Sequence, residues 1–277
     1  MVRILFIGDI VGKPGKQIVL RCLEPLRERE QIDFVVANAE NCEDGSGLKP
    51  GSFQEFCNHG VDVVTLGDHI YKKRVIFSAL ESDDRIVKPA NFPAEAPGKP
   101  WTIAKTKQGI EIAVFSLLGR VFMRPVDCPF TAADRVLNEI PETVKVRFLD
   151  FHAEATSDKQ LIGRYLDGKV SAVIGTHTHV TTADEQILPG GTAFQCDVGM
   201  TGPHDSIIGR DIERVLETTI TFKPRTFKVP NQNPILSATL IDVDEQTGLA
   251  LNIRRISVNE KESRELAENQ ASNPKTI

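Results

Sequence analysis

The stretch VRILFIGD, residues 2–9, decides the fold. It is a short apolar run that ends in a glycine and an acidic residue, and other apolar runs later in the chain also end in polar residues. A turn and a helix through about residue 30 should follow it. The strands expected in the first third are residues 2–8, 32–37 and 61–66, and the later helices are residues 51–58 and 73–81. This β-α-β-α-β rhythm predicts parallel strand pairing and an α/β fold.

The rest of the chain mixes hairpins with further strand–helix units and shows neither an internal repeat nor a linker. The expected strands are residues 101–106, 110–117, 144–151, 171–176, 235–243 and 249–258. The expected helices are residues 131–140 and 158–166 and one that starts near Gly209, after a β-rich stretch with its turn at Pro189-Gly190-Gly191. Residues 259–277 are polar and are expected to fray. We therefore predict a single α/β domain over residues 1–258, with mixed sheets, and a polar C-terminal tail over residues 259–277.

Composition and charge argue against several classes of protein. The formal net charge is −5, and no run of basic residues suggests a membrane or general nucleic-acid surface, so charge does not favour RNA as a partner. No apolar segment is long enough to span a membrane, and the apolar start is too short for a signal peptide. The five cysteines form no C-x-x-C pair, which argues against a disulfide framework and favours a reducing cytoplasm.

Polar residues follow several strands at the point where each strand ends. Four of the six histidines are among them. The strand-end residues are Asp9, Glu40, Asn41, Asp68, His69, His152, His177 and His179. Ligands bind at the carboxyl ends of the strands in open α/β sheets. The sequence therefore predicts that these side chains share one site.

Carboxylates and imidazoles together are typical ligands of transition metals such as Zn, Mn, Fe or Ni. His177 and His179 would point to the same side if their segment were extended. Alone, an H-x-H pair fits two surface histidines equally well, and a single strand-end aspartate is more often a helix N-cap. Three acids and three histidines brought together without a metal would crowd about three negative charges, which is costly. The combination favours a metal centre.

In this order, the strand-end residues resemble the five motif blocks of the calcineurin-like metallophosphoesterases, and more closely their bacterial YmdB-type branch. The blocks here are Asp9 with Val11 where the superfamily has histidine, Ala39-Glu40-Asn41, Gly67-Asp68-His69, Phe151-His152-Ala153 and Thr176-His177-Thr178-His179. The similarity extends over nearly the whole chain and includes residues 88–91 and 197–202. It implies a sandwich of two mixed β-sheets flanked by helices.

The resemblance also implies roles for these residues. One metal would be bound by Asp9, Glu40 and His179, and a second by Glu40, Asp68, His152 and His177. Two ions about 3.5–4 Å apart can share a bridging hydroxide that attacks phosphorus. Asn41 would orient the hydroxide or a phosphate oxygen, and His69 would be the general acid, unless it is only a supporting hydrogen-bond partner. Substrate contacts are expected at Asn91, Gly199 and Thr201.

The activity implied by the resemblance is hydrolysis of phosphodiesters, including cyclic nucleotides such as 2′,3′-cAMP, with two divalent or mixed-valence ions, Fe or Mn before Zn. A homo-oligomer is implied as well. The apolar hairpin 235–258 offers a contact edge for it, although the hairpin could equally complete a sheet. The alternative from another class is a regulatory protein that binds metal and a phosphorylated ligand or RNA with little turnover.

Asp68 departs from the family pattern, which usually has asparagine there. A carboxylate adds a negative charge, so it should tighten the second metal site, favour a harder ion and raise the pKa of His69 by stabilising its imidazolium. A P-loop is rejected, because only three residues separate Gly8 from Gly12-Lys13 and Pro14 follows the lysine. Cys42 and Cys196 are interpreted as buried structural thiols.

Overall fold

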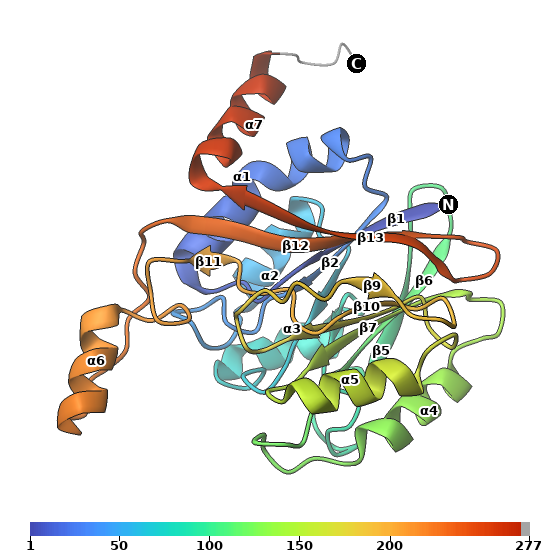
Figure 1. Ribbon diagram of the computed structural model, residues 1–277, viewed down its shortest axis with the longest axis horizontal. Coiled ribbons are helices and arrows are strands. Elements are labelled where there is room, and N and C mark those ends of the chain that lie inside the picture. Colours follow the sequence, from blue (N-terminus) through green and yellow to red (C-terminus); the bar gives the residue numbers. More distant parts are fainter. Residues whose placement is uncertain (273–277) are drawn as a thin grey trace.

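The computed structural model describes residues 1–272, with side chains as far as Gln270, and consists of two β-sheets stacked face to face with helices outside (Figure 1). The first sheet has the order β11-β12-β1-β2-β3-β4, with β13 paired to β12. The second has the order β5-β6-β7-β8-β10-β9. Both sheets mix parallel and antiparallel pairs. The predicted α/β sandwich of two mixed sheets is confirmed.

The elements of the first sheet and its helices come mainly from the two ends of the chain. The strands are β1 (Val2–Ile7), β2 (Phe34–Asn38), β3 (Val63–Thr65), β4 (Ile86–Val87), β11 (Gly202–Pro203), β12 (Pro234–Val243) and β13 (Ala250–Asn259). The helices are α1 (Gly12–Arg29), α2 (Pro50–Asn58), the 3₁₀ turn η1 (Arg74–Ile76), α3 (Phe77–Ser82), α6 (Ile212–Thr221) and α7 (Glu260–Ser272).

The second sheet is built from the middle of the chain. Its strands are β5 (Trp101–Lys105), β6 (Glu111–Leu118), β7 (Val146–His152), β8 (Ala172–Thr176), β9 (Gln186–Ile187) and β10 (Ala193–Gln195). Its helices are α4 (Pro129–Glu139) and α5 (Thr156–Tyr165). Among the described residues, no helix is both long and apolar enough to cross a membrane.

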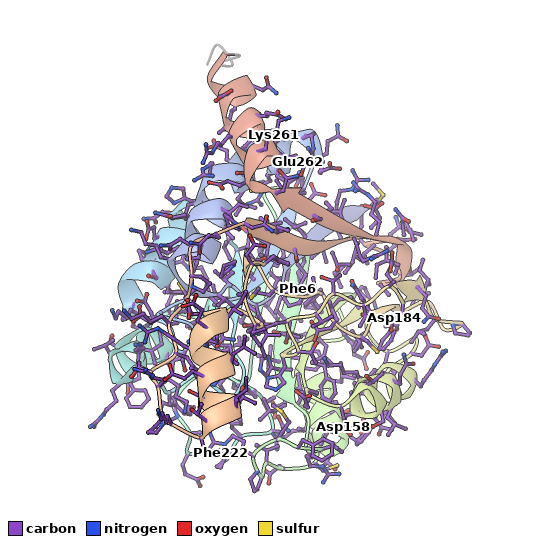
Figure 2. The ribbon with its side chains drawn as sticks, turned by 60° about the vertical axis from the view of Figure 1, so that its left-hand side comes forward. Phe6, Asp158, Asp184, Phe222, Lys261 and Glu262 are labelled. Carbon is purple, nitrogen blue, oxygen red and sulfur yellow. The ribbon has the colours of Figure 1, made fainter. Side chains whose placement is uncertain are left out.

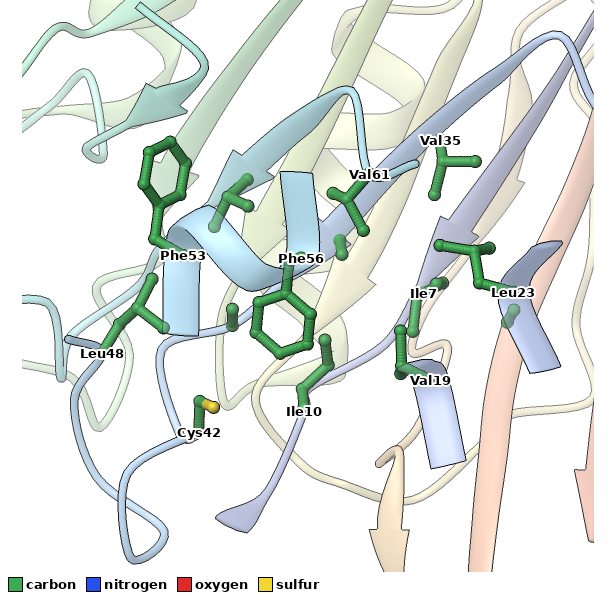
Figure 3. Close-up of a cluster of buried hydrophobic side chains, with 14 of the residues drawn as sticks. Ile7, Ile10, Val19, Leu23, Val35, Cys42, Leu48, Phe53, Phe56 and Val61 are labelled. Carbon is green, nitrogen blue, oxygen red and sulfur yellow. The ribbon is translucent and has the colours of Figure 1, made fainter. Parts of the chain in front are cut away.

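Side-chain alternation along the strands divides the core into layers. Ile4 and Phe6 of β1 face the second sheet, where the Phe6 and Phe148 rings lie 5.0 Å apart between centroids. Leu5 and Ile7 face the opposite way, toward the helices. Figure 3 shows this outer layer, with Ile7 and Val35 from the strands packed against Val19 and Leu23 of α1 and Phe53 and Phe56 of α2.

The parallel strands bring their carboxyl ends to one edge of the sandwich. In the first sheet β1, β2 and β3 are parallel neighbours, and in the second β6, β7 and β8 are. The two sets of strand ends therefore face each other across the sandwich. That edge holds the strand-end acids and histidines, as the sequence pattern predicted.

The structure corrects two local expectations and decides between the two alternatives left open for the hairpin 235–258. The turn expected at residues 12–15 is the first turn of α1, where Pro14 is tolerated because no intrahelical donor is needed there. The tail expected to fray forms helix α7, whose Ser263 hydroxyl accepts a hydrogen bond from Arg21 of α1; residues 273–277 of that tail lie outside the described residues. The hairpin 235–258 completes the first sheet, because β12 pairs with β1.

Candidate metal centre

Glu40 lies at the centre of the predicted site and is completely buried. It follows β2, and its Oε1 atom lies 3.2 Å from His152 Nε2 and 3.1 Å from His69 Nδ1. Its other oxygen accepts a hydrogen bond from the His69 backbone N–H at 2.9 Å. A carboxylate with neighbours on both sides can bridge two ions.

One side of Glu40 holds Asp68, His152 and His177. His152 Nε2 lies 3.2 Å from Asp68 Oδ1, and His177 Nδ1 lies 3.0 Å from His152 Nε2. The donor atoms of these three residues all lie within 4.8 Å of one another. Glu40, Asp68 and His69 form a second such group, and Asp9, Glu40 and His152 a third. Donor atoms this close, from mixed carboxylates and imidazoles, suit a transition metal.

The other side of Glu40 holds Asp9, Asn41 and His179. Asn41 Nδ2 lies 3.4 Å from Asp9 Oδ1 and 3.2 Å from His179 Nε2. His179 Nε2 is 3.8 Å from Asp9 Oδ1, and none of the three compact donor groups found in residues 1–270 includes it. The His179 ring thus lies beside Asp9 and Asn41, and its role as a metal ligand stays a prediction.

Three histidines have one ring nitrogen bound to an oxygen and the other turned toward the acids. His179 Nδ1 donates to the Ile208 carbonyl at 2.9 Å, and His177 Nε2 lies 3.2 Å from Glu154 Oε2. His152 Nδ1 lies 2.9 Å from Thr176 Oγ1. Such outer partners fix the tautomer and leave the inner nitrogen free to bind a metal. The arrangement fits a metal centre.

An unpaired polar atom fits the same conclusion. Asn41 Oδ1 is buried and has no hydrogen-bond partner, although its amide nitrogen lies among Asp9, Glu40 and His179. Buried polar atoms are nearly always paired, so an ion or a water bound to one would supply the missing partner.

The charges in the cluster perturb one another strongly. Burial opposes the charged form of Glu40, but the neighbouring His152 and His69 hold its pKa well below the usual range. Burial likewise opposes the His152 imidazolium, but Glu40 and Asp68 raise its pKa well above normal. Burial, followed by the charge of His152, lowers the pKa of His177 to about 4. Protonated His152 thus neutralises the acids, a task that a metal cation can take over.

The pKa of His69 is raised, as the sequence predicted. Burial works against its imidazolium, yet its pKa is raised, first by the hydrogen bond and charge of Glu40 and then by Asp68. Glu40 contributes more than Asp68, because Glu40 contacts the ring at 3.1 Å whereas Asp68 Oδ2 lies 3.9 Å away.

Asp150 is a supporting residue that sequence reasoning missed. It is completely buried, and it accepts hydrogen bonds from Thr176 Oγ1 at 2.7 Å, Thr65 Oγ1 at 2.6 Å and Asn38 Nδ2 at 2.9 Å. Because Thr176 donates to Asp150, its oxygen must accept from His152 Nδ1–H. Burial raises the pKa of Asp150 to about 6. A signal existed, since Asp150 and His152 are two apart on one strand and point the same way.

Asp150→Asn should lower metal affinity by roughly 10- to 100-fold, the usual effect of losing an outer partner of a ligating histidine. The amide can donate to Thr176, so the threonine is no longer fixed as the acceptor for His152. Titration of the metal-free protein with Mn²⁺ measures the change. Asp158→Asn, on the neighbouring helix α5, is the matched control and should leave affinity unchanged. Equal affinities of Asp150→Asn and the unaltered chain would contradict this role.

The H-x-H segment is not extended, so the condition for both rings to point to one side of a strand is not met. Strand β8 ends at Thr176, and His177 and His179 have φ values of 99° and 65°. Asp197 holds this turn, since its Oδ2 accepts from the Thr178 N–H at 3.0 Å and from buried Lys159 at 2.7 Å. The two rings reach the site because the turn is tight.

The three residues expected to contact substrate are each engaged by other parts of the protein. Asn91 Nδ2 donates to the Leu118 carbonyl at 2.8 Å and the Asp127 carbonyl at 3.1 Å. Thr201 Oγ1 donates to the Ser237 carbonyl at 3.1 Å. Gly199 has φ 87°, and a Cβ there would lie 2.1 Å from Thr181 Oγ1. All three therefore have structural tasks beside the site.

Comparison with known proteins agrees with the geometry. The chain is 44% identical over 258 residues to a 2′,3′-cyclic-nucleotide 2′-phosphodiesterase of Bacillus subtilis, covering 93% of this chain and 97% of that protein. A crystal structure of a hypothetical protein from Thermus thermophilus matches with a TM-score of 0.87 and 38% identity, covering 94% of this chain and 100% of that one. A phosphatase structure from Mycoplasma pneumoniae matches with a TM-score of 0.88 and 28% identity, covering 98% of each chain.

The YmdB-like protein family model matches residues 5–256, a range that includes every strand-end acid and histidine of the site. With this match and the 44% identical relative, the chain belongs to the YmdB-like family.

Proposed function

We propose that this chain is a dinuclear-metal phosphodiesterase that hydrolyses 2′,3′-cyclic nucleotides such as 2′,3′-cAMP. One observation carries the proposal: three histidines, each fixed by an outer partner, turn their inner nitrogens toward the acids around Glu40. The name of the Bacillus subtilis relative supports the substrate class.

The proposed ligand sets divide at Glu40. Asp9, Glu40 and His179 would hold one ion, and Glu40, Asp68, His152 and His177 the other. When bound, the two ions supply a hydroxide nucleophile and positive charge for the phosphoryl oxygens. Iron or manganese suits these mixed ligands, and Asp68 in particular favours a hard ion.

Asn41 and His69 are the proposed catalytic side chains. The amide nitrogen of Asn41 lies between the two halves of the centre, where it can donate a hydrogen bond to a phosphate oxygen. His69 Nδ1 donates to Glu40, which leaves Nε2 to carry the proton for the departing alkoxide. The His69 side chain is 29% exposed, so substrate can reach it.

Hydrolysis of 2′,3′-cAMP by the Mn²⁺-loaded chain tests the proposal. Breaking the P–O2′ bond should yield 3′-AMP, which chromatography separates from 2′-AMP. Metal binding with turnover no faster than the Glu40→Gln variant would overturn it and favour the alternative, a low-turnover regulatory protein that binds a phosphorylated ligand or RNA.

The proposed compartment is the reducing cytoplasm. All five cysteines are free in the structure. Burial raises the pKa of Cys22, Cys42 and Cys196 to about 12, so these thiols are inert, consistent with the structural role expected for Cys42 and Cys196.

The proposed homo-oligomer has a better contact surface in α6 than in the hairpin. Helix α6 stands clear of both sheets, contains no buried residue and ends at Phe222 (Figures 1 and 2). Ile212, Leu216 and Ile220 are 41%, 48% and 73% exposed and recur at helical spacing. The stripe is symmetric about Leu216, so a two-fold axis there would place Ile212 against Ile220 of the partner subunit.

Leu216→Asp should therefore convert the oligomer to a monomer, because it places a charge at the centre of an apolar contact. Light scattering coupled to gel filtration at micromolar concentration measures the mass. Leu251→Asp, at an exposed position of β13, is the matched control and should leave the mass unchanged. An unaltered chain that is already monomeric would refute the oligomer.

A further inference from the structure

The loop between β6 and α4 presents an exposed aromatic side chain. Phe122 is 89% exposed, the most exposed phenylalanine of the second sheet's connections, and it has φ 60°. Its neighbours behave differently, since Met123 and Val126 pack against the core of the first sheet. The loop thus partly buries two of its apolar side chains and leaves Val121 and Phe122, its largest, exposed.

Both stems of this loop are fixed. At the start, the Asp158 carboxylate accepts hydrogen bonds from the Arg120 and Val121 N–H groups at 3.0 Å each; Figure 2 labels Asp158. At the end, Asn91 donates to the Asp127 carbonyl at 3.1 Å, while its Oδ1 accepts from the Leu118 N–H at 2.8 Å. Phe122 therefore lies in a loop whose two ends are held by hydrogen bonds.

The loop begins beside the metal centre. Leu118 pairs in register with His152, and the Gly119 N–H donates to the His152 carbonyl at 2.9 Å. Phe122 follows Leu118 by four residues, so its backbone lies within about 14 Å of the strand end, even if the chain were fully extended. If the phosphate of a nucleotide lies at the metal centre, its base can extend over a distance of this order toward Phe122.

The loop also carries two positively charged side chains. Arg120 and Arg124 flank Phe122, and the Arg124 guanidinium lies 5.3 Å above the centre of the Phe92 ring. Phosphate oxygens favour arginine, and bases stack on phenylalanine whatever their sequence. An exposed aromatic ring with an arginine two residues to either side, on a loop that starts beside the metal centre, suits a nucleotide better than a base-free phosphodiester.

We propose that Phe122 is a stacking platform for the nucleobase and makes the enzyme prefer nucleotides over base-free phosphodiesters. The proposal rests on the proposed function, whose metal centre handles the phosphate. Phe122 acts on recognition, so its loss should raise KM and leave kcat nearly unchanged. Stacking of one base on an aromatic side chain corresponds to roughly 10- to 100-fold in binding.

The test compares two substrates of the Mn²⁺-loaded chain, 2′,3′-cAMP and 1-O-methylribose 2′,3′-cyclic phosphate, which lacks a base. Phe122→Ala should lower kcat/KM for 2′,3′-cAMP by about 10- to 100-fold and leave the base-free compound unaffected. Phe122→Trp should restore the preference. Phe222→Ala is the matched control, since Phe222 is 90% exposed with φ 57° but ends α6.

An equal fall in kcat/KM on both substrates would overturn the proposal and make Phe122 a structural residue. An unchanged kcat/KM on both would show that Phe122 does not contact the substrate and would overturn it as well. A fall in oligomeric mass with unchanged KM would assign Phe122 to a protein contact instead. Failure of the unaltered chain to hydrolyse either compound would refute the proposed function. In that case, calorimetry would compare the affinity of the unaltered chain and of Phe122→Ala for 3′-AMP. Weaker binding by Phe122→Ala would support base stacking on Phe122, and equal binding would overturn it.

Discussion

Glu40→Gln is expected to lower turnover of 2′,3′-cAMP by about 10³-fold or more and to leave less than one metal ion per chain. A bridging carboxylate serves both ions, so the neutral amide weakens both at once, and each bound ion contributes several kcal/mol of transition-state stabilisation. Glu40 is also the residue around which the other ligands are arranged, within 3.2 Å of His152 and 3.1 Å of His69. Steady-state rates and elemental analysis on the same sample measure both effects.

Glu43→Gln is the matched control for this change. Glu43 lies three residues along the same loop, and its carboxylate accepts a hydrogen bond from Ser52 at 2.6 Å, outside the cluster. It should leave rate and metal content unchanged. Retention of two ions by Glu40→Gln would show that Glu40 does not bridge, and circular dichroism would confirm that the variant is folded.

His69→Ala is expected to keep both ions but to lose about 10²–10⁴-fold in turnover of 2′,3′-cAMP, whose alkoxide leaves poorly without a proton. The loss should be much smaller for bis-p-nitrophenyl phosphate, because p-nitrophenolate departs with little protonation. The geometry supports this division, since His69 Nδ1 lies 3.1 Å from Glu40 Oε1, whereas Nε2 lies 3.9 Å from Asp68 Oδ2, beyond hydrogen-bond distance. Rates on the two substrates and metal content give the comparison.

Asp68→Asn separates the two neighbours in Gly67-Asp68-His69. Asparagine keeps an oxygen donor of nearly the same shape, so metal retention should fall modestly and activity should survive or rise. If His69→Ala instead loses metal and loses activity equally on both substrates, His69 is a ligand or a structural residue and the general acid must be sought elsewhere.

Much of the site was predictable because the sequence places acids and imidazoles at the ends of apolar runs. Parallel pairing brings such ends together, which is how Asp9, Glu40 and His152 meet from two sheets. Alternation along β7 places Asp150 on the same face as His152, but the link between them was not predictable, because it passes through Thr176 on a different strand. A contact of this kind depends on strand register, which periodicity does not specify.

The errors have physical causes as well. His177 and His179 would share one side only if their segment were extended, but it is a turn with positive φ values, in which the Asp197 carboxylate accepts a hydrogen bond from the Thr178 N–H. Asn91 stays a prediction as a substrate contact, and its amide nitrogen donates to the Leu118 and Asp127 carbonyls. Helix α7 was expected to fray because its residues are polar, whereas its contact with α1 supplies the stabilisation that composition does not show.

Elemental analysis of the chain after loading with Mn²⁺ and removal of free metal tests the central claim most directly. The arrangement of Asp9, Glu40, Asp68, His152, His177 and His179 predicts close to two ions per chain, falling below one in Glu40→Gln. A chain that retains no metal after loading, or retains the same amount in Glu40→Gln as in the unaltered protein, would contradict a dinuclear centre at this edge of the sheets.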